Sequence, residues 1–465
     1  MLFNSMEFLC FLCITFTLYR AIRDHRRQNV FLLVAGYVFY GWWDWRFCGL
    51  LALVSASAFA TGLIIEQWPQ KRKWALVANV AVNLAVLLTF KYFDFFAESA
   101  AELLRLIGFN PDCPTLHLIL PVGISFYTFQ AISYTIDIAR GDIRPTHNAV
   151  HFFAYISFFP QLVAGPIERA SNLLPQFGRE RKFDGSVATD GLRQMLWGLF
   201  KKMVVADNCA VAVNAIWARL DSATAPEAAI AAVLFAMQIY ADFSGYSDIA
   251  LGCAKLFGFN LSINFRYPYF AVNIADFWRR WHISLTSWLR DYVYIPLGGN
   301  RQGQAKTFRN ILIVWALSGL WHGAAWTFVA WGLWHGTLIV IWRLARRNNR
   351  GGLAAMCFTF LLVCLGWILF RAESLTQAMT FFCTLTRWDS LDVTLPAQTL
   401  ALPIAAGILM LAAEWMARTR DHALQFSPNS ILSRHGSLRM ACYIVLAMLI
   451  CVYAGTQSQF IYFRF

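Results

Sequence analysis

The stretch SGLWHGAAW at residues 318–326 places a single histidine, His322, inside an apolar run. An imidazole titrates near neutral pH, so it can act as a general base or carry an acyl group during part of a reaction. Such a histidine can equally be a packing residue, and the run alone does not exclude that role. Its neighbours favour chemistry, because small residues leave space beside the ring and indoles wall it. These neighbours are Gly323, Ala324, Ala325, Trp321 and Trp326.

Other polar residues also stand within apolar runs. Charged side chains there cost roughly 2.5–3.5 kcal/mol on insertion scales, so they indicate a function by default. Gln130 stands among aromatic residues in the run 125–137. The run 238–252 contains Asp242, Ser244, Ser247 and Asp248. His335, in LWHGTLI, would lie about 220° round a continuous helix from His322, which favours a structural or supporting role for it.

The composition is that of a membrane protein. Of the 465 residues, 58% are hydrophobic and 14% charged, whereas soluble domains have about 25% charged residues. Apolar runs of about 20 residues, the length that crosses the hydrocarbon core, recur from end to end. We expect an all-α polytopic protein of about eleven membrane-crossing or re-entrant helices, with residues 1–465 forming a single integral-membrane domain.

The formal net charge of +13 raises the question of nucleic-acid binding, but basic loops also orient membrane proteins. Tracing the helices from residues 5–19 onward places 29 of the 39 lysines and arginines in loops on one side and six on the other. Basic loops stay in the cytoplasm, so both termini are predicted to be extracytoplasmic. We therefore expect membrane lipid, and no nucleic acid, as a partner.

Two segments do not fit simple crossing. Residues 150–165 have basic flanks on the same predicted side and contain Pro160, which favours a re-entrant segment. Residues 268–309 are too charged to span the membrane, yet rich in Trp and Tyr. They form either an amphipathic segment at the cytoplasmic interface or a polar vestibule. The charged residues that would line the vestibule are Asp276, Arg279, Arg280, His282, Arg290 and Asp291.

Several classes of site find no support in the sequence. The eleven cysteines are scattered singly, mostly in apolar runs, so we expect no metal site. The G-x-S-x-G elbow, the Walker loop and the H-E-x-x-H zinc motif are all absent. The common hydrolase, nucleotide-binding and zinc-protease motifs therefore do not explain this chain.

Six stretches together resemble the membrane-bound O-acyltransferase (MBOAT) family, in particular its bacterial branch, which includes alginate O-acetylases and the membrane subunit of D-alanyl transfer. They are FYGWWDWRF (39–47), LPVGISFYTFQ (120–130), FFPQLVAGPIER (158–169), ADFSGYSDIALG (241–252), NFRYPYFAVNIADFWRRWHISLTSWLRDYVYIPLGGNR (264–301) and LSGLWHGAAWTFVAWGLWHG (317–336). The resemblance covers nearly the whole chain. It implies helices in a ring around a thin centre, where a funnel from one face meets a tunnel from the other. It places His322 at that junction and makes His282 the second catalytic histidine. The polar residues of the two runs described above become candidates for the funnel wall.

The resemblance also implies a reaction. An acetyl group would pass from a cytoplasmic thioester, acetyl-CoA, through the bacterial inner membrane to an exported, alginate-like polysaccharide, with a periplasmic O-acetyltransferase subunit as partner. No bound cofactor is expected. His322 would be the general base or a transient acyl carrier, and His282 would orient or stabilise. The vestibule formed by Asp276, Arg279, Arg280 and Arg290 would attract the phosphates of the donor.

The last residues, QFIYFRF (459–465), lie within a predicted extracytoplasmic tail, 456–465. They resemble the aromatic C-terminus of the small partner peptide in D-alanylation systems. By that analogy Tyr462 relays the acetyl group on its phenol oxygen; the other interpretation is an aromatic anchor at the membrane interface.

Two alternatives for the whole chain remain open. The acceptor could be peptidoglycan or cellulose, with the same mechanism. A transporter or channel belongs to a different class but also has broken helices and polar residues at membrane depth. No inverted repeat is visible in the sequence, and the aromatic and basic segment 268–301 is hard to assign in a transporter.

Overall fold

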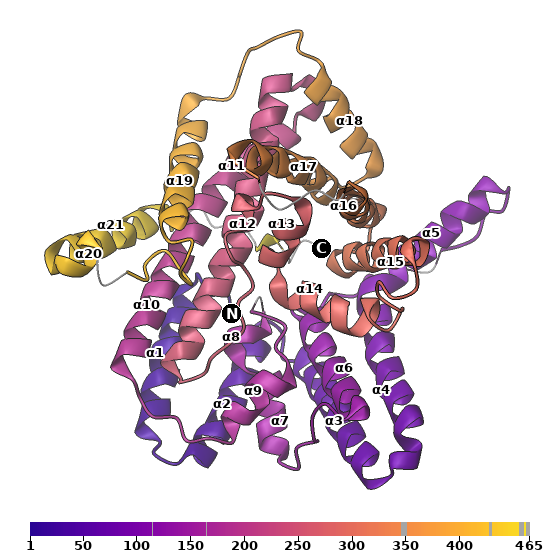
Figure 1. The fold of residues 1–465 in the computed structure, drawn as a ribbon, viewed down its shortest axis with the longest axis vertical. Helices are drawn as coiled ribbons and strands as arrows, with labels where there is room; N and C mark the ends of the chain where they lie inside the picture. The colour runs from indigo at the N-terminus through magenta and orange to yellow at the C-terminus, as the bar shows by residue number, and fades with distance from the viewer. Residues whose placement is uncertain (114, 164, 346–350, 427–429, 455–459, 462–465) are drawn as a thin grey trace. The chain divides into compact units, whose positions relative to one another are not determined.

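The computed structural model describes residues 1–465 except 114, 164, 346–350, 427–429, 455–459 and 462–465. Every regular element in that part of the chain is a helix (Figure 1), so the all-α prediction is confirmed. The chain divides into two compact units, residues 1–184 with 256–261 and residues 185–255 with 262–465. That residues 1–465 act as one domain stays a prediction.

The first unit holds helices α1 to α9. Short polar side chains begin the first two, because the opening turn of a helix has N–H groups without a helical partner. Ser5 accepts a hydrogen bond from the N–H of Phe8 at the start of α1, and Asp24 accepts one from Arg26 at the start of α2. The bounds are α1 Met6–Ala21, α2 His25–Gly41, α3 Phe47–Gln67, η1 Pro69–Lys71, α4 Arg72–Leu87, η2 Leu88–Tyr92, α5 Phe93–Leu106, α6 Ile124–Arg140, α7 Ala149–Ile156, α8 Phe159–Leu162 and α9 Ala170–Phe177.

The second unit holds the elements that follow, and it contains both histidines predicted to be catalytic. Its bounds are α10 Gly185–Leu199, η3 Phe200–Ala206, α11 Asp207–Trp217, η4 Leu220–Ser222, α12 Ala225–Leu256, η5 Pro268–Phe270, α13 Ile274–Arg280, α14 Ile283–Leu289, η6 Arg290–Tyr294, α15 Gln304–His322, α16 Trp326–Leu344, α17 Leu353–Arg371, α18 Leu375–Thr386, α19 Ala397–Met416, α20 Ile431–Arg434 and α21 Gly436–Tyr453.

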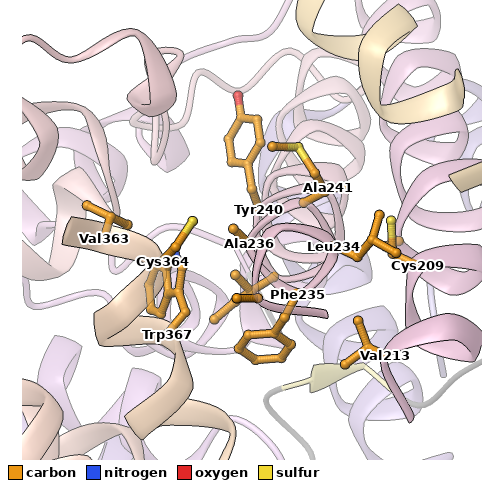
Figure 2. Packing of buried hydrophobic residues seen from close by; sticks show 14 of the residues in the cluster. Cys209, Val213, Leu234, Phe235, Ala236, Tyr240, Ala241, Val363, Cys364 and Trp367 are labelled. Carbon is orange, nitrogen blue, oxygen red and sulfur yellow. The ribbon is translucent and has the colours of Figure 1, made fainter. Parts of the chain in front are cut away.

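The core of the second unit is built around α12, a helix of 32 residues. A helix that is apolar on nearly all sides is expected to be buried, and 83% of the most apolar window of α12 is indeed buried. Figure 2 shows side chains of α11, α12 and α17 meeting in this core, among them Cys209, Leu234 and Trp367. The polar residues of α12 are therefore held inside a packed cluster.

Six helical segments in the described part of the chain are long and apolar enough to cross a membrane. They are Phe47–Gln67, Pro69–Leu106, Ala225–Leu256, Leu353–Arg371, Ala397–Met416 and Gly436–Tyr453. Shorter helices such as α2 and α6, with 17 residues each, rise only about 26 Å at 1.5 Å per residue, slightly less than the hydrocarbon core. A polytopic architecture is thus supported, while the count of about eleven, the ring and the funnel stay predictions.

The two segments that did not fit simple membrane crossing, 150–165 and 268–309, each consist of several short helices in the structure. Residues 150–165 form the short helices α7 and α8, which are separated at Ser157 and Phe158. That break fits the proline-interrupted segment predicted there, although re-entry into a membrane stays a prediction. Residues 268–309 contain the short helices η5, α13, α14 and η6 and the first residues of α15, and none of the four short helices is a candidate span.

The region of His322 and His335 is not one continuous helix. α15 ends at His322, and α16 begins at Trp326 after extended backbone at Gly323 and Ala325. The two histidines therefore lie on different helices, and the angle of about 220° expected for a continuous helix does not apply. A glycine is required at the break because the ring of Phe328 occupies the space that a Cβ at residue 323 would take.

Candidate active site

His322 is buried among aromatic rings. Only 3% of its surface is exposed. Its ring centroid lies 5.0 Å from those of Trp321 and Trp331, and 5.4 Å from that of Phe370, each with an edge-to-face orientation. Such an enclosure excludes water and fixes the plane of the imidazole.

The residues that enclose His322 agree in part with those expected, because Trp321 contacts the imidazole as predicted. A Cβ on Gly323 would collide with the ring of Phe328, so the glycine admits that ring and leaves no open space. Trp326, the other indole expected beside the ring, is 54% exposed. Trp331, from α16, also packs against the histidine, and that contact was not expected.

His282 lies beside His322, with ring centroids 6.2 Å apart. Its other ring neighbours are Phe243 at 4.7 Å and Trp321 at 5.6 Å. His282 has a left-handed backbone, with φ 42° and ψ 55°, a conformation that residues other than glycine adopt infrequently and that costs about 1–3 kcal/mol. Burial lowers the pKa of His282 to about 3, so this imidazole is neutral at pH 7 and can orient a partner without carrying charge.

A set of hydrogen bonds centred on Asn264 holds the backbone at His282. The N–H of Ile283 donates to the carbonyl of Asn264 at 2.9 Å. The hydroxyl of Ser284 donates to Asn264 Oδ1 at 2.6 Å, and Asn264 Nδ2 donates to the hydroxyl of Ser247 at 3.2 Å. Ser247, on α12, therefore helps to position the segment that carries His282.

His335 has a supporting place in the same region. It is fully buried, and its Nδ1 accepts a hydrogen bond from the indole of Trp278 at 3.3 Å. Its ring centroid lies 5.0 Å from that of Trp331, the same indole that contacts His322. The structural role predicted for His335 agrees with this geometry, because it holds two tryptophans of the site.

A cavity of about 580 Å³ lies next to the neighbours of both histidines, within the usual size range of ligand pockets. Ser318, one turn before His322 on α15, lines it, as does Ile283, the residue after His282. His322 itself is not among the described residues that line the cavity. The remaining wall is mostly apolar, with Trp278, Trp315 and Trp342, and its basic residues are Arg279, Arg290 and Arg343.

The predicted vestibule residues fall into two groups. Arg279 and Arg290 line the cavity just described, whereas Asp276 and Arg280, again with Arg279, line a separate cavity of about 370 Å³. Asp276 Oδ1 lies 3.1 Å from Arg280 Nε and 4.0 Å from Arg279 Nη2. Arg290 Nε pairs with Asp291 at 2.7 Å.

Lys202 and two carboxylates form a buried ionic group on η3, α11 and α12. Lys202 Nζ lies 2.8 Å from both Asp207 Oδ1 and Asp242 Oδ1, and all three side chains are at most 2% exposed. Removing one partner of such a group leaves an uncompensated buried charge, which costs about 3–5 kcal/mol. Asp242 is therefore held as part of a structural ionic group.

Lys201 forms a second such group with the remaining polar residues of α12. Its Nζ lies 2.6 Å from Asp248 Oδ2 and 2.9 Å from the hydroxyl of Ser244. Glu414 Oε1, from α19, lies 3.7 Å away, and its Oε2 accepts a hydrogen bond from Tyr240 at 2.8 Å. Whether Asp242, Ser244, Ser247 and Asp248 also face a funnel stays a prediction.

Two glycines allow these ionic groups to form. A Cβ on Gly198 would lie 2.5 Å from the carbonyl oxygen of Gly245, and a Cβ on Gly245 would lie 2.8 Å from that of Gly198. Small residues let helix backbones approach closely in membranes. α12 and the end of α10 are thereby close enough for the lysines of η3 to reach the carboxylates of α12.

The described part of the C-terminal tail enters this core. Ile461 is 3% exposed, and its N–H donates to Asp242 Oδ2 at 2.7 Å. Phe460 is fully buried, with its ring centroid 6.2 Å from that of Phe243. The Phe243 ring also lies 4.7 Å from that of His282, so the tail and His282 contact the same side chain of α12.

Three further predicted features have different outcomes. Gln130 is 2% exposed on α6 of the first unit, and its role stays a prediction. Among the residues that the structure describes, no group of three His, Cys, Asp or Glu side chains could hold a metal ion. Tyr462 lies outside the described residues.

Sequence reasoning missed several residues of the site region. The lysine pair in GLFKKMVVAD (198–207) stands in an apolar run. Asp242 was selected because it is a charged residue in an apolar run, and the same criterion selects both lysines. Glu414, in the apolar α19, met it too. By contrast, the contacts of Trp331, Phe370 and Ser318 depend on how helices pack, and no local pattern marks them.

The comparisons with known proteins give one consistent answer. Residues 34–351 match the model of the MBOAT, membrane-bound O-acyltransferase family. A protein of Pseudomonas putida named "probable alginate O-acetylase AlgI" is 42% identical over 82% of this chain and 79% of its own length. A Helicobacter pylori protein named "peptidoglycan O-acetyltransferase" is 32% identical over 100% of this chain and 98% of its own. A Bacillus subtilis protein named "teichoic acid D-alanyltransferase" is 26% identical over 57% of this chain and 72% of its own.

The matched region contains both histidines, the 580 Å³ cavity and the charged residues of α12. The candidate spans, the helical fold and these relatives agree. This chain is a multi-pass membrane protein that belongs to the membrane-bound O-acyltransferase family.

Proposed function

We propose that this protein moves an acetyl group from a cytoplasmic thioester, acetyl-CoA, toward an exported polysaccharide, with His322 as the reacting imidazole. The observation that carries the proposal is the meeting of two histidines 40 residues apart in the sequence, with ring centroids 6.2 Å from each other. They adjoin residues of a cavity large enough for the arm of a thioester. An enzyme that joins a water-soluble donor to an exported acceptor needs such a protected site within the membrane.

The chemistry follows from the environment of His322. As a general base, the imidazole removes the proton of an incoming hydroxyl while the hydroxyl oxygen attacks the thioester carbonyl. The carbon–sulfur bond then breaks, and the thiolate takes the proton back from the imidazolium. As a nucleophile, the imidazole instead attacks the thioester carbonyl, the carbon–sulfur bond breaks, and the thiolate takes the ring proton and leaves as a thiol. The acceptor hydroxyl then attacks the acyl-imidazole, takes the acetyl group and gives its proton to the ring nitrogen that is released. In both routes the aromatic enclosure excludes the water that would otherwise hydrolyse the donor.

During acyl transfer at His322, the neutral imidazole of His282 is held in a fixed orientation beside the reacting ring. Its depressed pKa means that it does not compete for the proton at pH 7. Its left-handed backbone and the Asn264 hydrogen bonds hold the ring against that of His322. Strained backbone that surrounding structure over-determines is a feature of active sites, which supports a positioning or stabilising role for His282.

The donor enters from the side that carries the basic residues. Arg279, Arg290 and Arg343 line the cavity, and their charges attract the phosphates of a CoA thioester. The apolar wall suits the less polar arm that leads to the acyl group. On the predicted topology this side is cytoplasmic and both termini are periplasmic, in the inner membrane of a bacterium.

A relay through Tyr462 solves the problem of the acceptor, because a polymer does not fit a narrow site within the membrane. The seating of Ile461 on Asp242 supports a tail that reaches toward the histidines. The phenol of Tyr462 accepts the acetyl group and passes it to a periplasmic O-acetyltransferase subunit, which acetylates the polysaccharide. An alginate-like acceptor is favoured by the 42% identical relative, and peptidoglycan by the 32% identical one.

Purified protein in lipid vesicles tests the class of function. With acetyl-CoA labelled in its acetyl group, we expect release of free CoA and transfer of label to the protein or to added acceptor. An equal amount of vesicle without protein is the control. Solute or ion flux through the vesicles with no consumption of thioester would instead support the transporter interpretation and contradict the enzyme.

A further inference from the structure

One carboxylate of α12 holds the backbone of the C-terminal tail. Asp242 Oδ2 accepts a hydrogen bond from the N–H of Ile461 at 2.7 Å, and both residues are buried. A hydrogen bond to an ionised acceptor is about twice as strong as one between neutral groups. Burial strengthens it further, because the local dielectric is low and water does not compete. This one bond therefore fixes the tail at Ile461.

The charges around Asp242 favour such a donor. A single ammonium, that of Lys202, lies 2.8 Å from one oxygen of Asp207 and from Oδ1 of Asp242. These three side chains therefore have a formal surplus of one negative charge. Burying a charge is costly unless it is paired and hydrogen-bonded. Oδ1 of Asp242 faces the lysine and Oδ2 binds the tail, so the carboxylate joins the ionic group to the tail.

Phe460 fixes the tail a second time, beside this hydrogen bond. It is fully buried, and its ring centroid lies 4.2 Å from that of Tyr246 and 6.2 Å from that of Phe243. Asp242, Phe243 and Tyr246 all belong to α12, and we call these three residues the tail seat. A main-chain hydrogen bond combined with a side-chain pocket is how extended peptides are commonly recognised. The tail seat thus has the features of a peptide-binding subsite.

The tail seat lies next to the histidine pair, because the ring of Phe243 also lies 4.7 Å from that of His282. In the sequence, Tyr462 directly follows Ile461. We propose that Asp242 is a positioning residue that sets the register of the tail, so that the residue directly after Ile461 receives the acetyl group. The inference rests on the proposed function and adds to it the residue that selects the acceptor.

Asp242 takes no part in making or breaking bonds. In the general-base route the phenol oxygen of Tyr462 gains the acetyl group, and its proton passes through the imidazole of His322 to the departing thiolate. Placement decides the rate of this step, since an error of about 1 Å can cost about a hundredfold. One residue of extended chain spans about 3.3–3.6 Å. A register error of a single residue is therefore enough to stop the transfer.

Hydrogen exchange of the full-length protein in nanodiscs tests the tail seat without any acyl chemistry. The N–H of Ile461, resolved by fragmentation of the C-terminal peptide, should exchange at least about a hundredfold more slowly than in the free peptide. In Asp242→Asn the exchange should become about tenfold faster or more, because the charge of the acceptor is lost. Lys202 keeps Asp207 as its partner in that variant. Asp221→Asn, at an exposed aspartate of η4, is the control and should leave the exchange unchanged.

A pair of insertions tests the register and leaves the ionic group intact. A glycine inserted between Ile461 and Tyr462 should lower acetylation of the tail by about tenfold or more. A glycine inserted between Gly455 and Thr456 keeps the spacing from Ile461 to Tyr462, and a longer connection costs little entropy, so acetylation should be near normal. The measurement is the mass of the C-terminal peptide after incubation with labelled acetyl-CoA. Equal acetylation in the two variants, or equal loss in both, would refute the register role of Asp242.

The outcomes separate this inference from the proposed function. If the N–H of Ile461 exchanges as fast as in the free peptide, the tail seat is refuted whether or not the protein consumes a thioester. If the N–H is protected but no thioester is consumed, the proposed function is wrong and the register role falls with it. Protection, consumption of thioester and the predicted difference between the two insertions together support the assignment.

Discussion

His322→Gln is expected to lower the rate of acetyl transfer by about 10²–10⁴-fold or more, the usual contribution of a general base. Glutamine is similar in size and can form a hydrogen bond, but it can neither take up a proton nor carry an acyl group. The aromatic enclosure formed by Trp321, Trp331 and Phe370 holds either side chain. The measurement is the acetyl content of the exported polysaccharide, with the amount of protein in the membrane fraction determined in parallel.

His435→Gln is the matched control, because His435 is exposed at the start of α21 and no step of the reaction uses it. Its acetylation should equal that of the unaltered protein. If His322→Gln kept near-normal acetylation at a normal protein level, His322 would be a packing residue and the proposed mechanism would be refuted.

Tyr462→Phe is expected to abolish acetylation of the polymer while consumption of donor at the buried site is retained for at most one turnover. Phenylalanine keeps the aromatic ring and so keeps any membrane anchor, but it removes the oxygen that would accept the acetyl group. The seat of the tail at Asp242 uses the backbone of Ile461, so this substitution leaves that hydrogen bond in place. Mass spectrometry of the C-terminal peptide should find an acetyl adduct in the unaltered protein and none in the variant.

Tyr453→Phe provides the comparison, since Tyr453 ends α21 in the same part of the chain. Its product should be acetylated normally. Unchanged acetylation in Tyr462→Phe would exclude the relay and leave direct transfer to an acceptor at the site.

The sequence was a good guide to the type of fold and to the two histidines. Apolar runs of membrane-crossing length indicated a helical membrane protein, and six such helices are present in the described residues. His322 and His282 were identified by resemblance, and the structure brings their rings to 6.2 Å.

The surroundings of His322 could not be predicted from its neighbours in the sequence. Gly323 was expected to leave open space beside the imidazole. In the structure, the ring of Phe328 fills the position that a Cβ at residue 323 would take. Trp331 stands one helix later and was not expected to contact His322. A side chain's contacts across a helix break depend on tertiary packing, which a local pattern does not contain.

For the polar residues of α12, the sequence identified the residues but not their ionic partners. Asp242 and Asp248 were detected because charge is costly in an apolar run, but their lysine partners determine what they do. Lys201 and Lys202 neutralise them in a buried ionic cluster, so a structural role coexists with any role at a funnel. Only the pairing, which depends on the close approach of Gly198 and Gly245, reveals this.

The central claim is that the imidazole of His322 is reached by an acyl donor through the cavity lined by Ser318 and Arg279. The most direct test is a density map of the protein bound to CoA or a stable thioester analogue. We predict density for the arm of the ligand along the apolar cavity, with its sulfur next to the His322 ring. A map that shows the ligand elsewhere, with none of its atoms next to the His322 ring, would contradict the account.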